Sequence, residues 1–359
     1  MCKLIRSELA DALKRKPSVS IVIVNYNGVK FIKRCLESVL NDNYTNFEVI
    51  LIDNASADGS FELVKNLFGL YPHLRIIRSN ENLGYVGGNN IGFKYSKGKY
   101  VIFLNQDVEV NQHWLRELIK VMESDPTIGA AQCKLLRLYD KRRIDSTGQL
   151  IDFLGYGHPR GDENKGQYAH MEEIFYADGA ALTVRRQIID EVSFDGLPFD
   201  PDYSPMYYED ADLCWRIRLR GYKVMFVPGS IVYHARSAAE LHKMSSHLIF
   251  SHVKNRIATL IKNYSLKNLL RYMPLLLVFE AIRAIILLKI KPSHSIAILR
   301  AILWNLKNLN GTWRKRLIIQ RLVRKVSDSY LMKYMVKFNP TYLYHSFRKY
   351  YGMADDDAH

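Results

Sequence analysis

The sequence has 359 residues, 48% of them hydrophobic and 12% aromatic, which excludes a chain that is mainly disordered. The net charge of +15 is uneven: residues 1–233 hold 29 basic and 30 acidic side chains, whereas residues 234–359 hold 22 and 6. The four cysteines are scattered without a CxxC pair, which argues against a disulfide framework or a zinc site. The charge asymmetry predicts two regions, the second of which faces an anionic surface.

The predicted elements alternate between strand and helix. Residues 1–17 are expected to form a short amphipathic helical segment. Apolar, β-branched runs predict buried strands, and amphipathic runs between them predict helices. This alternation predicts an α/β fold with a mostly parallel sheet that is flanked by helices. The expected strands are 18–24, 47–52, 74–77, 100–104, 128–133 and 223–227; the expected helices are 31–40, 61–68, 90–96, 114–122 and 209–220.

Polar side chains follow several of these strands. Asn25, Tyr26 and Asn27 follow the first strand, Asp53 ends the second, and Asp107 comes soon after the fourth. Because ligands of parallel sheets bind at the carboxyl ends of the strands, we expect these residues to converge in one crevice. Residues 134–175 are polar and irregular, and we interpret them as a long loop or small insertion over this site.

Asp107 and Glu109 are separated by one residue after an apolar strand. This spacing lets both carboxylates bind one hard cation such as Mg²⁺ or Mn²⁺, which would bridge to a diphosphate. A solvated acidic turn is the alternative. Asp53 could accept hydrogen bonds from a base or ribose, whereas a helix cap is the better explanation for Asp58. His234 ends another apolar strand, where a lone histidine is more often structural than a ligand.

Residues 80–92 are rich in glycine and asparagine and run into the helix expected at 90–96. Such a segment lets the backbone approach a ligand closely, and a helix N-terminus favours anions. The glycines do not follow the first strand, so a dinucleotide-binding fingerprint is a poor interpretation. A plain glycine-rich turn stays open as an alternative.

Three carboxylates, Glu209, Asp210 and Asp212, begin the helix expected at 209–220. The helix dipole alone favours acids at this position. The functional interpretation makes one of them a general base that deprotonates an acceptor hydroxyl.

Taken in order, these segments resemble the family 2 glycosyltransferases, and among them the rhamnosyltransferase-like branch. The resemblance covers about residues 18–240 and implies a GT-A fold and an inverting transfer. It rests on residues 20–27, 53–60, 82–84 with 88–90, 104–107, 178–180 and 209–213.

The resemblance also implies a role for each motif. Tyr26 would stack on the nucleotide base, and Asp53 would hydrogen-bond the base or ribose. Asp210 would be the catalytic base. The metal ligands would be Asp107, Glu109 and His234, although the motif reads D-x-E here where the family has D-x-D. Residues near the sugar or acceptor would be Asp178, Gly179 and Glu209. The residues that bind the sugar donor would be Asn25, Tyr26, Asn27, Asp53, Asn82, Gly84, Asn89, Asn90, Asn105 and Asp107.

Residues 241–359 are apolar and basic at once, and we expect a helical region that associates with a membrane. A spanning helix needs about 20 mostly apolar residues. Residues 272–290 come close but contain Glu280 and Arg283, so we favour helices that lie in the interface, with Lys and Arg reaching anionic headgroups. A spanning hairpin, a solvated helical subdomain and an oligomer interface are the alternatives. Nucleic-acid binding is not expected, because no motif for it is present.

The prediction is therefore a metal-dependent glycosyltransferase of class EC 2.4 at the cytoplasmic face of the cell membrane, which works in cell-surface glycan synthesis. Its sugar donor would be a nucleoside diphosphate sugar, with rhamnose on thymidine diphosphate as the first choice and uridine or guanosine carriers open. Its acceptor would be a lipid-linked saccharide. The alternatives are a non-catalytic scaffold and a sugar nucleotidyltransferase, which would carry a loop rich in glycine and arginine where this chain has residues 25–30.

Overall fold

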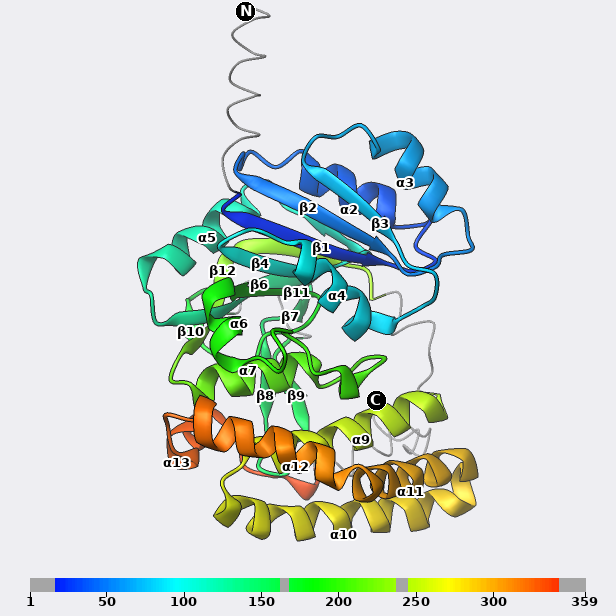
Figure 1. Ribbon diagram of the computed structural model, residues 1–359, viewed down its shortest axis with the longest axis vertical. Helices are drawn as coiled ribbons and strands as arrows, with labels where there is room; N and C mark the ends of the chain where they lie inside the picture. The colour runs from blue at the N-terminus through cyan, green and yellow to red at the C-terminus, as the bar shows by residue number, and fades with distance from the viewer. Residues whose placement is uncertain (1–16, 162–167, 237–244, 342–359) are drawn as a thin grey trace, which may run out of the picture.

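The computed structural model describes residues 17–161, 168–236 and 245–341, so the helix predicted at 1–17 lies almost entirely outside the described residues. A mixed ten-stranded sheet has helices on both faces, and further helices lie beyond one of them (Figure 1). Its strand order is β10-β12-β6-β11-β4-β1-β2-β3, with β5 beside β12 and β7 beside β6. The strands are β1 Val19–Asn25, β2 Phe47–Asp53, β3 Leu74–Arg78, β4 Tyr100–Asn105, β5 Val108–Val110, β6 Ile128–Arg137, β7 Ile144–Ser146, β10 Glu172–Glu173, β11 Ala181–Arg185 and β12 Lys223–His234, with β8 Gln149–Ile151 and β9 Gly157–Pro159 as a separate pair.

Eleven α-helices are described. The helices expected at 31–40, 61–68, 114–122 and 209–220 begin within one residue of the predicted start. The helices are α2 Ile32–Leu40, α3 Ser60–Phe68, α4 Gly84–Tyr95, α5 Trp114–Ser124, α6 Arg186–Val192, α7 Glu209–Leu219, α9 Ser246–Asn263, α10 Leu266–Ile290, α11 Pro292–Lys307, α12 Leu309–Ile318 and α13 Asp328–Leu331, with the short turns η1 Pro201–Tyr203, η2 Ile319–Val323 and η3 Met332–Tyr334.

The first half of the sheet is parallel and brings the predicted strand ends together. β1 pairs in parallel with β2 and with β4, and β2 pairs in parallel with β3. In this register Asn25 lies opposite Asp53, and Val24 lies opposite Asn105. The expected convergence of these ends at one edge is therefore confirmed. β11 then enters antiparallel to β4, so the sheet is mixed.

Helix α4 begins six residues earlier than predicted, because most of the glycine-rich segment is itself helical. A Cβ at Gly88 would lie 2.7 Å from Val24, and one at Gly92 would lie 2.2 Å from Val22. These glycines let α4 pack directly onto β1, so tertiary packing outweighs the low helix propensity of glycine.

Two segments were predicted with too little strand. Residues 134–175 contain the end of β6 and the whole of β7, β8, β9 and β10 rather than one long loop. β12 runs from Lys223 to His234, well beyond the strand expected at 223–227, and its ladder has an irregularity between Val227 and Ile231. The strands β7 to β10 have only two or three residues each, so they lack the long apolar runs from which the prediction was made.

Helices α9 to α13 share a hydrophobic core with the sheet. One buried cluster includes Phe103 and Phe226 of the sheet together with Ile257, Leu276 and Ile298 of the C-terminal helices. The boundary predicted between residues 240 and 241 falls in a segment outside the described residues. Among the helices that the structure describes, none is both long and apolar enough to cross a membrane, which overturns the alternative of a spanning hairpin.

Candidate active site

Asn25 and Asp53 meet at the paired ends of β1 and β2. The amide nitrogen of Asn25 lies 2.9 Å from Asp53 Oδ1, 3.0 Å from Ser56 Oγ and 2.9 Å from Ser60 Oγ. Asp53 also forms an ion pair with Arg78, with 3.5 Å between Oδ2 and Nε. Both Asn25 and Asp53 are fully buried. Their side chains thus brace the strand ends and the loop after β2, a structural role that the sequence did not predict for Asn25.

Tyr26 projects from the loop that these contacts hold. Its side chain is 44% exposed, while its backbone N–H donates to Gln106 Oε1 at 2.8 Å and its carbonyl accepts from Gln106 Nε2 at 3.0 Å. Asn27 has a left-handed backbone with φ of 50°, and its Oδ1 accepts from the Ala57 N–H at 2.9 Å. The loop is therefore fixed at its backbone, and the aromatic ring of Tyr26 is open to solvent.

Four residues predicted to bind the sugar donor, Asn82, Gly84, Asn89 and Asn90, lie in α4 or just before it. Asn82 Oδ1 accepts from the Gly84 N–H at 2.9 Å. Asn89 is buried, and its Oδ1 has no hydrogen-bond partner in the part of the chain that the structure describes. Asn90 instead bonds to both the N–H and the carbonyl of Phe199, at 3.2 and 2.9 Å. Asn90 thus ties α4 to the loop before η1, whereas Asn89 keeps an unused acceptor.

Asp107 and His234 lie together at the ends of β4 and β12. His234 Nε2 is 3.5 Å from both Asp107 Oδ1 and Asn105 Nδ2. On the other side of the ring, His234 Nδ1 is 2.8 Å from Asp145 Oδ2. Burial by itself would lower the pKa of His234, but the two carboxylates raise it to about 10. Asp145, which lies in β7, was not predicted, because its segment was interpreted as a loop.

Glu109 does not join this pair. Its Oε1 is 3.8 Å from Arg34 Nη1 of α2, and within the described residues no three His, Cys, Asp or Glu side chains gather closely enough to hold a metal ion. The structure thus places Asp107 and His234 together and Glu109 beside Arg34. A carboxylate oxygen and an imidazole nitrogen are ligands that suit Mn²⁺ or Mg²⁺, so this pair fits part of a coordination shell.

Asp210 begins α7 next to Glu209. Its Oδ2 accepts from the Gly179 N–H at 3.0 Å, and its Oδ1 accepts from the Ala211 N–H at 2.7 Å. Burial and then the nearby Asp178 raise the pKa of Asp210 to about 7. Burial and the charge of Asp210 raise the pKa of Glu209 well above its ordinary value. A carboxylate that titrates near neutrality is suited to general base catalysis.

The turn at residues 178–180 connects Asp210 to the rest of the site. Tyr85 of α4 donates its hydroxyl to the Gly179 carbonyl at 2.7 Å, and the Asn105 N–H donates to the Ala180 carbonyl at 3.0 Å. A Cβ at Gly179 would lie 3.0 Å from the Tyr85 hydroxyl, so this close approach favours glycine. Asp178 and Gly179 thus lie between Asp210 and the strand end that leads to Asp107. Tyr85 was missed, although it lies inside the glycine-rich segment.

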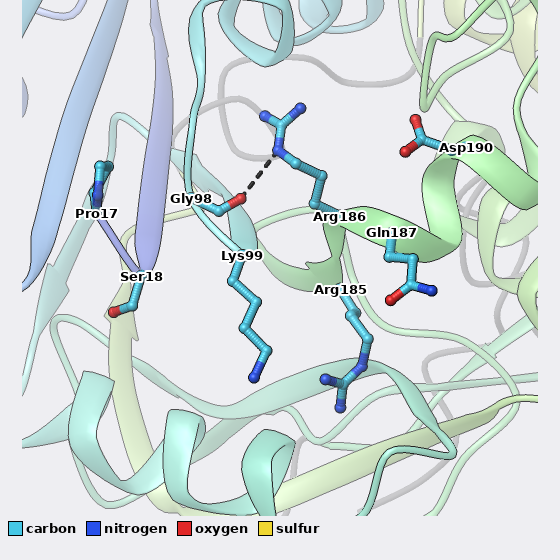
Figure 2. A pocket seen from close by; sticks show the side chains of 8 residues that line it. All are labelled: Pro17, Ser18, Gly98, Lys99, Arg185, Arg186, Gln187 and Asp190. Carbon is cyan, nitrogen blue, oxygen red and sulfur yellow. Dashed lines mark hydrogen bonds between the residues drawn. The ribbon is translucent and has the colours of Figure 1, made fainter. Parts of the chain in front are cut away.

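A surface pocket lies at the opposite edge of the sheet (Figure 2). It is formed where β1 and β4 begin and β11 ends, so it is far along the strands from the residues above. Its arginines are engaged with backbone carbonyls: Arg186 Nε donates to Gly98 at 3.0 Å, and Arg185 donates to Met122 and Ile128. Hence these arginines support the fold, and the candidate site is at the carboxyl ends of the strands.

Residues 20–193 match the family described as glycosyl transferase family 2. An uncharacterized protein of Sinorhizobium fredii is 29% identical over 63% of this chain, but the match spans a quarter (25%) of its own length. The glycosyltransferase AglE of Haloferax volcanii is 27% identical over 63% of this chain and 70% of its own. A mannosyltransferase from Pyrobaculum calidifontis, solved with GDP-Man and Mn²⁺, shares the fold with a TM-score of 0.51 at 17% identity, over 84% of this chain and 94% of its own. The chain is thus a glycosyltransferase with a GT-A-like fold, and its match to family 2 covers residues 20–193.

Proposed function

We propose that the protein transfers a sugar from a nucleoside diphosphate sugar to an acceptor hydroxyl and inverts the anomeric carbon. The observation that carries this proposal is the position of Asp210: a partly buried carboxylate with a pKa near 7, joined through the turn at residues 178–180 to the strand end that leads to Asp107. In this reaction Asp210 takes the proton of the acceptor hydroxyl, whose oxygen bonds to the anomeric carbon as the bond to the diphosphate oxygen breaks. The diphosphate leaves with the electron pair, and no enzyme nucleophile is required.

The sugar donor would occupy the edge formed by β1, β2 and β4. The exposed ring of Tyr26 would stack on the base. Asn89 Oδ1 in α4, which has no hydrogen-bond partner among the described residues, would accept a hydrogen bond from the sugar donor. Asp107 and His234 would hold Mg²⁺ or Mn²⁺, which supplies positive charge against the leaving diphosphate. Rhamnose on thymidine diphosphate is the first donor to test, from the resemblance of the motifs. GDP-Man is included because the Pyrobaculum mannosyltransferase was solved with it.

We further propose that the acceptor is lipid-linked and that the protein binds the cytoplasmic surface of an anionic membrane through α10 to α12. Among the described residues, 18 of the 26 large apolar side chains that are exposed lie between Leu266 and Leu322. Single exposed apolar residues are normal, but a concentration of this kind marks an interaction surface. The same span has no exposed Asp or Glu, which fits an anionic bilayer and opposes a contact between two copies. Its exposed cations are Lys267, Arg271, Lys289, Lys291, Arg300, Lys307, Arg314 and Arg321.

Turnover of purified protein tests the chemistry. A panel of thymidine, uridine and guanosine diphosphate sugars with Mg²⁺ or Mn²⁺ should give metal-dependent release of a nucleoside diphosphate. Asp210→Asn should lower the rate by about 10²- to 10⁴-fold, the usual contribution of a general base, and should leave binding of the sugar donor intact by thermal shift. Asp190→Asn, at an exposed position on the opposite edge of the sheet, is the matched control and should keep full activity. Normal turnover by Asp210→Asn would show that the base is another residue.

A further inference from the structure

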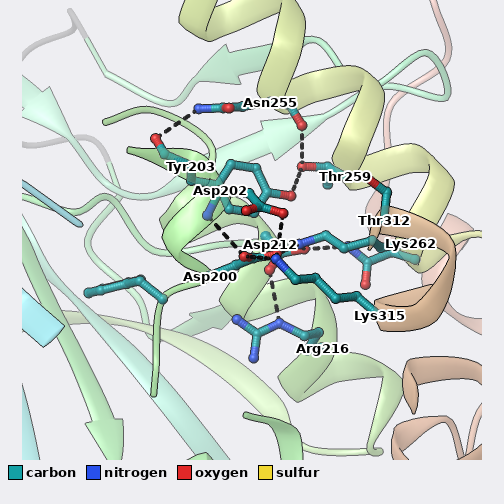
Figure 3. A network of polar contacts seen from close by, with 12 residues as sticks. Asp200, Asp202, Tyr203, Asp212, Arg216, Asn255, Thr259, Lys262, Thr312 and Lys315 are labelled. Carbon is teal, nitrogen blue, oxygen red and sulfur yellow. Dashed lines mark hydrogen bonds and ion pairs between the residues drawn. The ribbon is translucent and has the colours of Figure 1, made fainter. Parts of the chain in front are cut away.

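Helix α9 buries a row of polar side chains, of residue types that are mostly exposed in folded proteins. Lys254, Asn255, Arg256, Lys262 and Asn263 are all at most 5% exposed. Buried polar groups need partners, because an unpaired one costs about 1–3 kcal/mol. In Figure 3 two of them, Asn255 and Lys262, point away from α9 toward η1, which precedes Asp210 in the chain, and toward α7, which contains Asp210.

Asn255 binds the segment before Asp210. Its amide nitrogen lies 3.2 Å from the carbonyl of Tyr203, 3.1 Å from that of Met206 and 2.7 Å from that of Tyr207. Lys254 Nζ donates to the carbonyls of Asp202 and Ser204, at 2.6 and 3.2 Å. One turn of α9 therefore binds five carbonyls of residues 202–207.

This segment also has a conformation that needs support. Tyr207 and Tyr208 have φ values of 80° and 68°, in the left-handed region that side chains other than glycine disfavour. Such conformations persist only when the surroundings hold them. The ring of His252 stacks on Tyr207 with centroids 4.0 Å apart, so the same face of α9 supports the strained backbone as well as the carbonyls before it.

The last turns of α9 bind the segment after Asp210. Lys262 Nζ is 3.2 Å from Asp212 Oδ1, and Asn263 Nδ2 donates to the same oxygen at 2.9 Å. Asp212 is fully buried, two residues after Asp210 in the first turn of α7. Residues 202–207 and residue 212 are thus both fixed by one helix of the C-terminal region.

We propose that Asn255 is a positioning residue for the base, through which α9 holds the segment that carries Asp210 against Gly179. This proposal rests on the proposed function of Asp210. Without the amide of Asn255, the left-handed residues 207 and 208 would relax and Asp210 would move away from the Gly179 N–H and toward water. The C-terminal region would then be part of the catalytic machinery as well as the means of attachment to a surface.

Asn255→Ala tests the proposal against Asn305→Ala. Asn305 is also a buried asparagine that donates to two backbone carbonyls, those of Lys254 and Ala301, but it belongs to α11 and does not contact residues 202–208. Asn255→Ala should lower kcat at least about tenfold, as expected for a misplaced catalytic group, with the KM for the sugar donor changed less than about threefold. Asn305→Ala should keep kcat, even if its melting temperature falls by as much as that of Asn255→Ala.

The pH dependence of kcat separates positioning from a general loss of structure. Asp178, Glu209, Tyr85, Tyr176 and Cys214 are the titratable groups that interact with Asp210. Hydration of a displaced Asp210 weakens the effect of its burial, so the acidic limb of the profile should move to lower pH in Asn255→Ala and stay in place in Asn305→Ala.

The outcomes distinguish the two proposals. An unchanged kcat and acidic limb in folded Asn255→Ala, or an equal change in Asn305→Ala, overturns the positioning role. If Asn255→Ala does not fold, His252→Leu tests the same segment through the stack on Tyr207: a lower kcat with a shifted limb supports the role, and a wild-type profile overturns it. Normal turnover by Asp210→Asn contradicts the proposed function itself, whatever the Asn255 variant does.

Discussion

Helices α9 and α10 are consecutive, yet they reverse the usual distribution of side chains in opposite ways. α9 buries lysine, arginine and asparagine, whereas α10 exposes leucine, isoleucine and valine. The polar residues of α9 have found partners inside the protein, in the segment before Asp210 and in the carboxylate of Asp212. The exposed apolar residues of α10 are not covered by any of the described residues. The difference supports two proposals: that α9 positions the active site, and that α10 binds a surface outside the chain.

The first way to break this comparison is to remove a buried cation of α9. Lys262 Nζ lies 2.6 Å from Asp200 and 3.2 Å from Asp212, and all three side chains are at most 1% exposed (Figure 3). Lys262→Met leaves two buried carboxylates short of their shared cation, so the free energy of unfolding should fall by about 3–5 kcal/mol in urea titrations. Lys315→Met is the control: Lys315 also binds Asp200, but it is 23% exposed, and its loss should cost clearly less. Equal losses would mean that burial within α9 is not what gives Lys262 its importance.

The second test concerns the apolar stripe on α10 that consists of Leu275, Val278, Ile282 and Ile285. These side chains are 50%, 56%, 48% and 66% exposed. Replacing all four by serine should weaken binding to vesicles that contain anionic lipid by about 10²- to 10³-fold, since each half-exposed side chain contributes about 1 kcal/mol on insertion. Vesicle cosedimentation measures the effect, and the free energy of unfolding should change little.

Leu67→Ser with Leu70→Ser provides the matched control, because both residues are exposed but lie at the end of α3 or just after it. Vesicle binding should be unaffected by this pair. Dimerisation of the wild-type protein that disappears with the α10 variant, in the absence of any vesicle binding, would assign the stripe to a second copy of the chain instead.

The sequence predicts the parallel part of the molecule much better than the rest. Apolar runs define β1, β2 and β4, and the pairing of parallel strands then brings Asn25, Asp53 and Asp107 to one edge. Interactions between distant segments are not visible in this way. Asp145 became the partner of His234 only because β7 pairs with β6, and the polar face of α9 looks like a solvated surface until the carbonyls it binds are known. The early start of α4 likewise depends on contacts between glycines and β1.

The pH dependence of kcat tests the assignment of Asp210 as the base. Because burial and Asp178 raise the pKa of Asp210 to about 7, the base is protonated below that pH, and kcat should fall about tenfold per pH unit there and level off above it. Asp178→Asn removes a neighbouring negative charge, so the pKa of Asp210 should fall and the acidic limb should move to lower pH. A limb that stays in place would show that another group limits the rate in this range.

The smallest expected effect is a gain in stability from Glu209→Gln. Burial and Asp210 raise the pKa of Glu209 well above its ordinary value, so the folded state favours the protonated form. As the pH rises above the unfolded pKa of about 4.3, ionisation in the unfolded chain increasingly opposes folding, and wild-type stability falls. Glutamine cannot ionise, so at pH 8 the free energy of unfolding of the variant should exceed that of wild type by about 1 kcal/mol. Urea titrations measure this difference, which should shrink toward pH 5. Glu81→Gln, an exposed position, should show no such trend. A destabilised variant at pH 8 would mean that the Glu209 carboxylate makes a favourable contact that outweighs its burial, and the site would then resemble the satisfied polar row of α9.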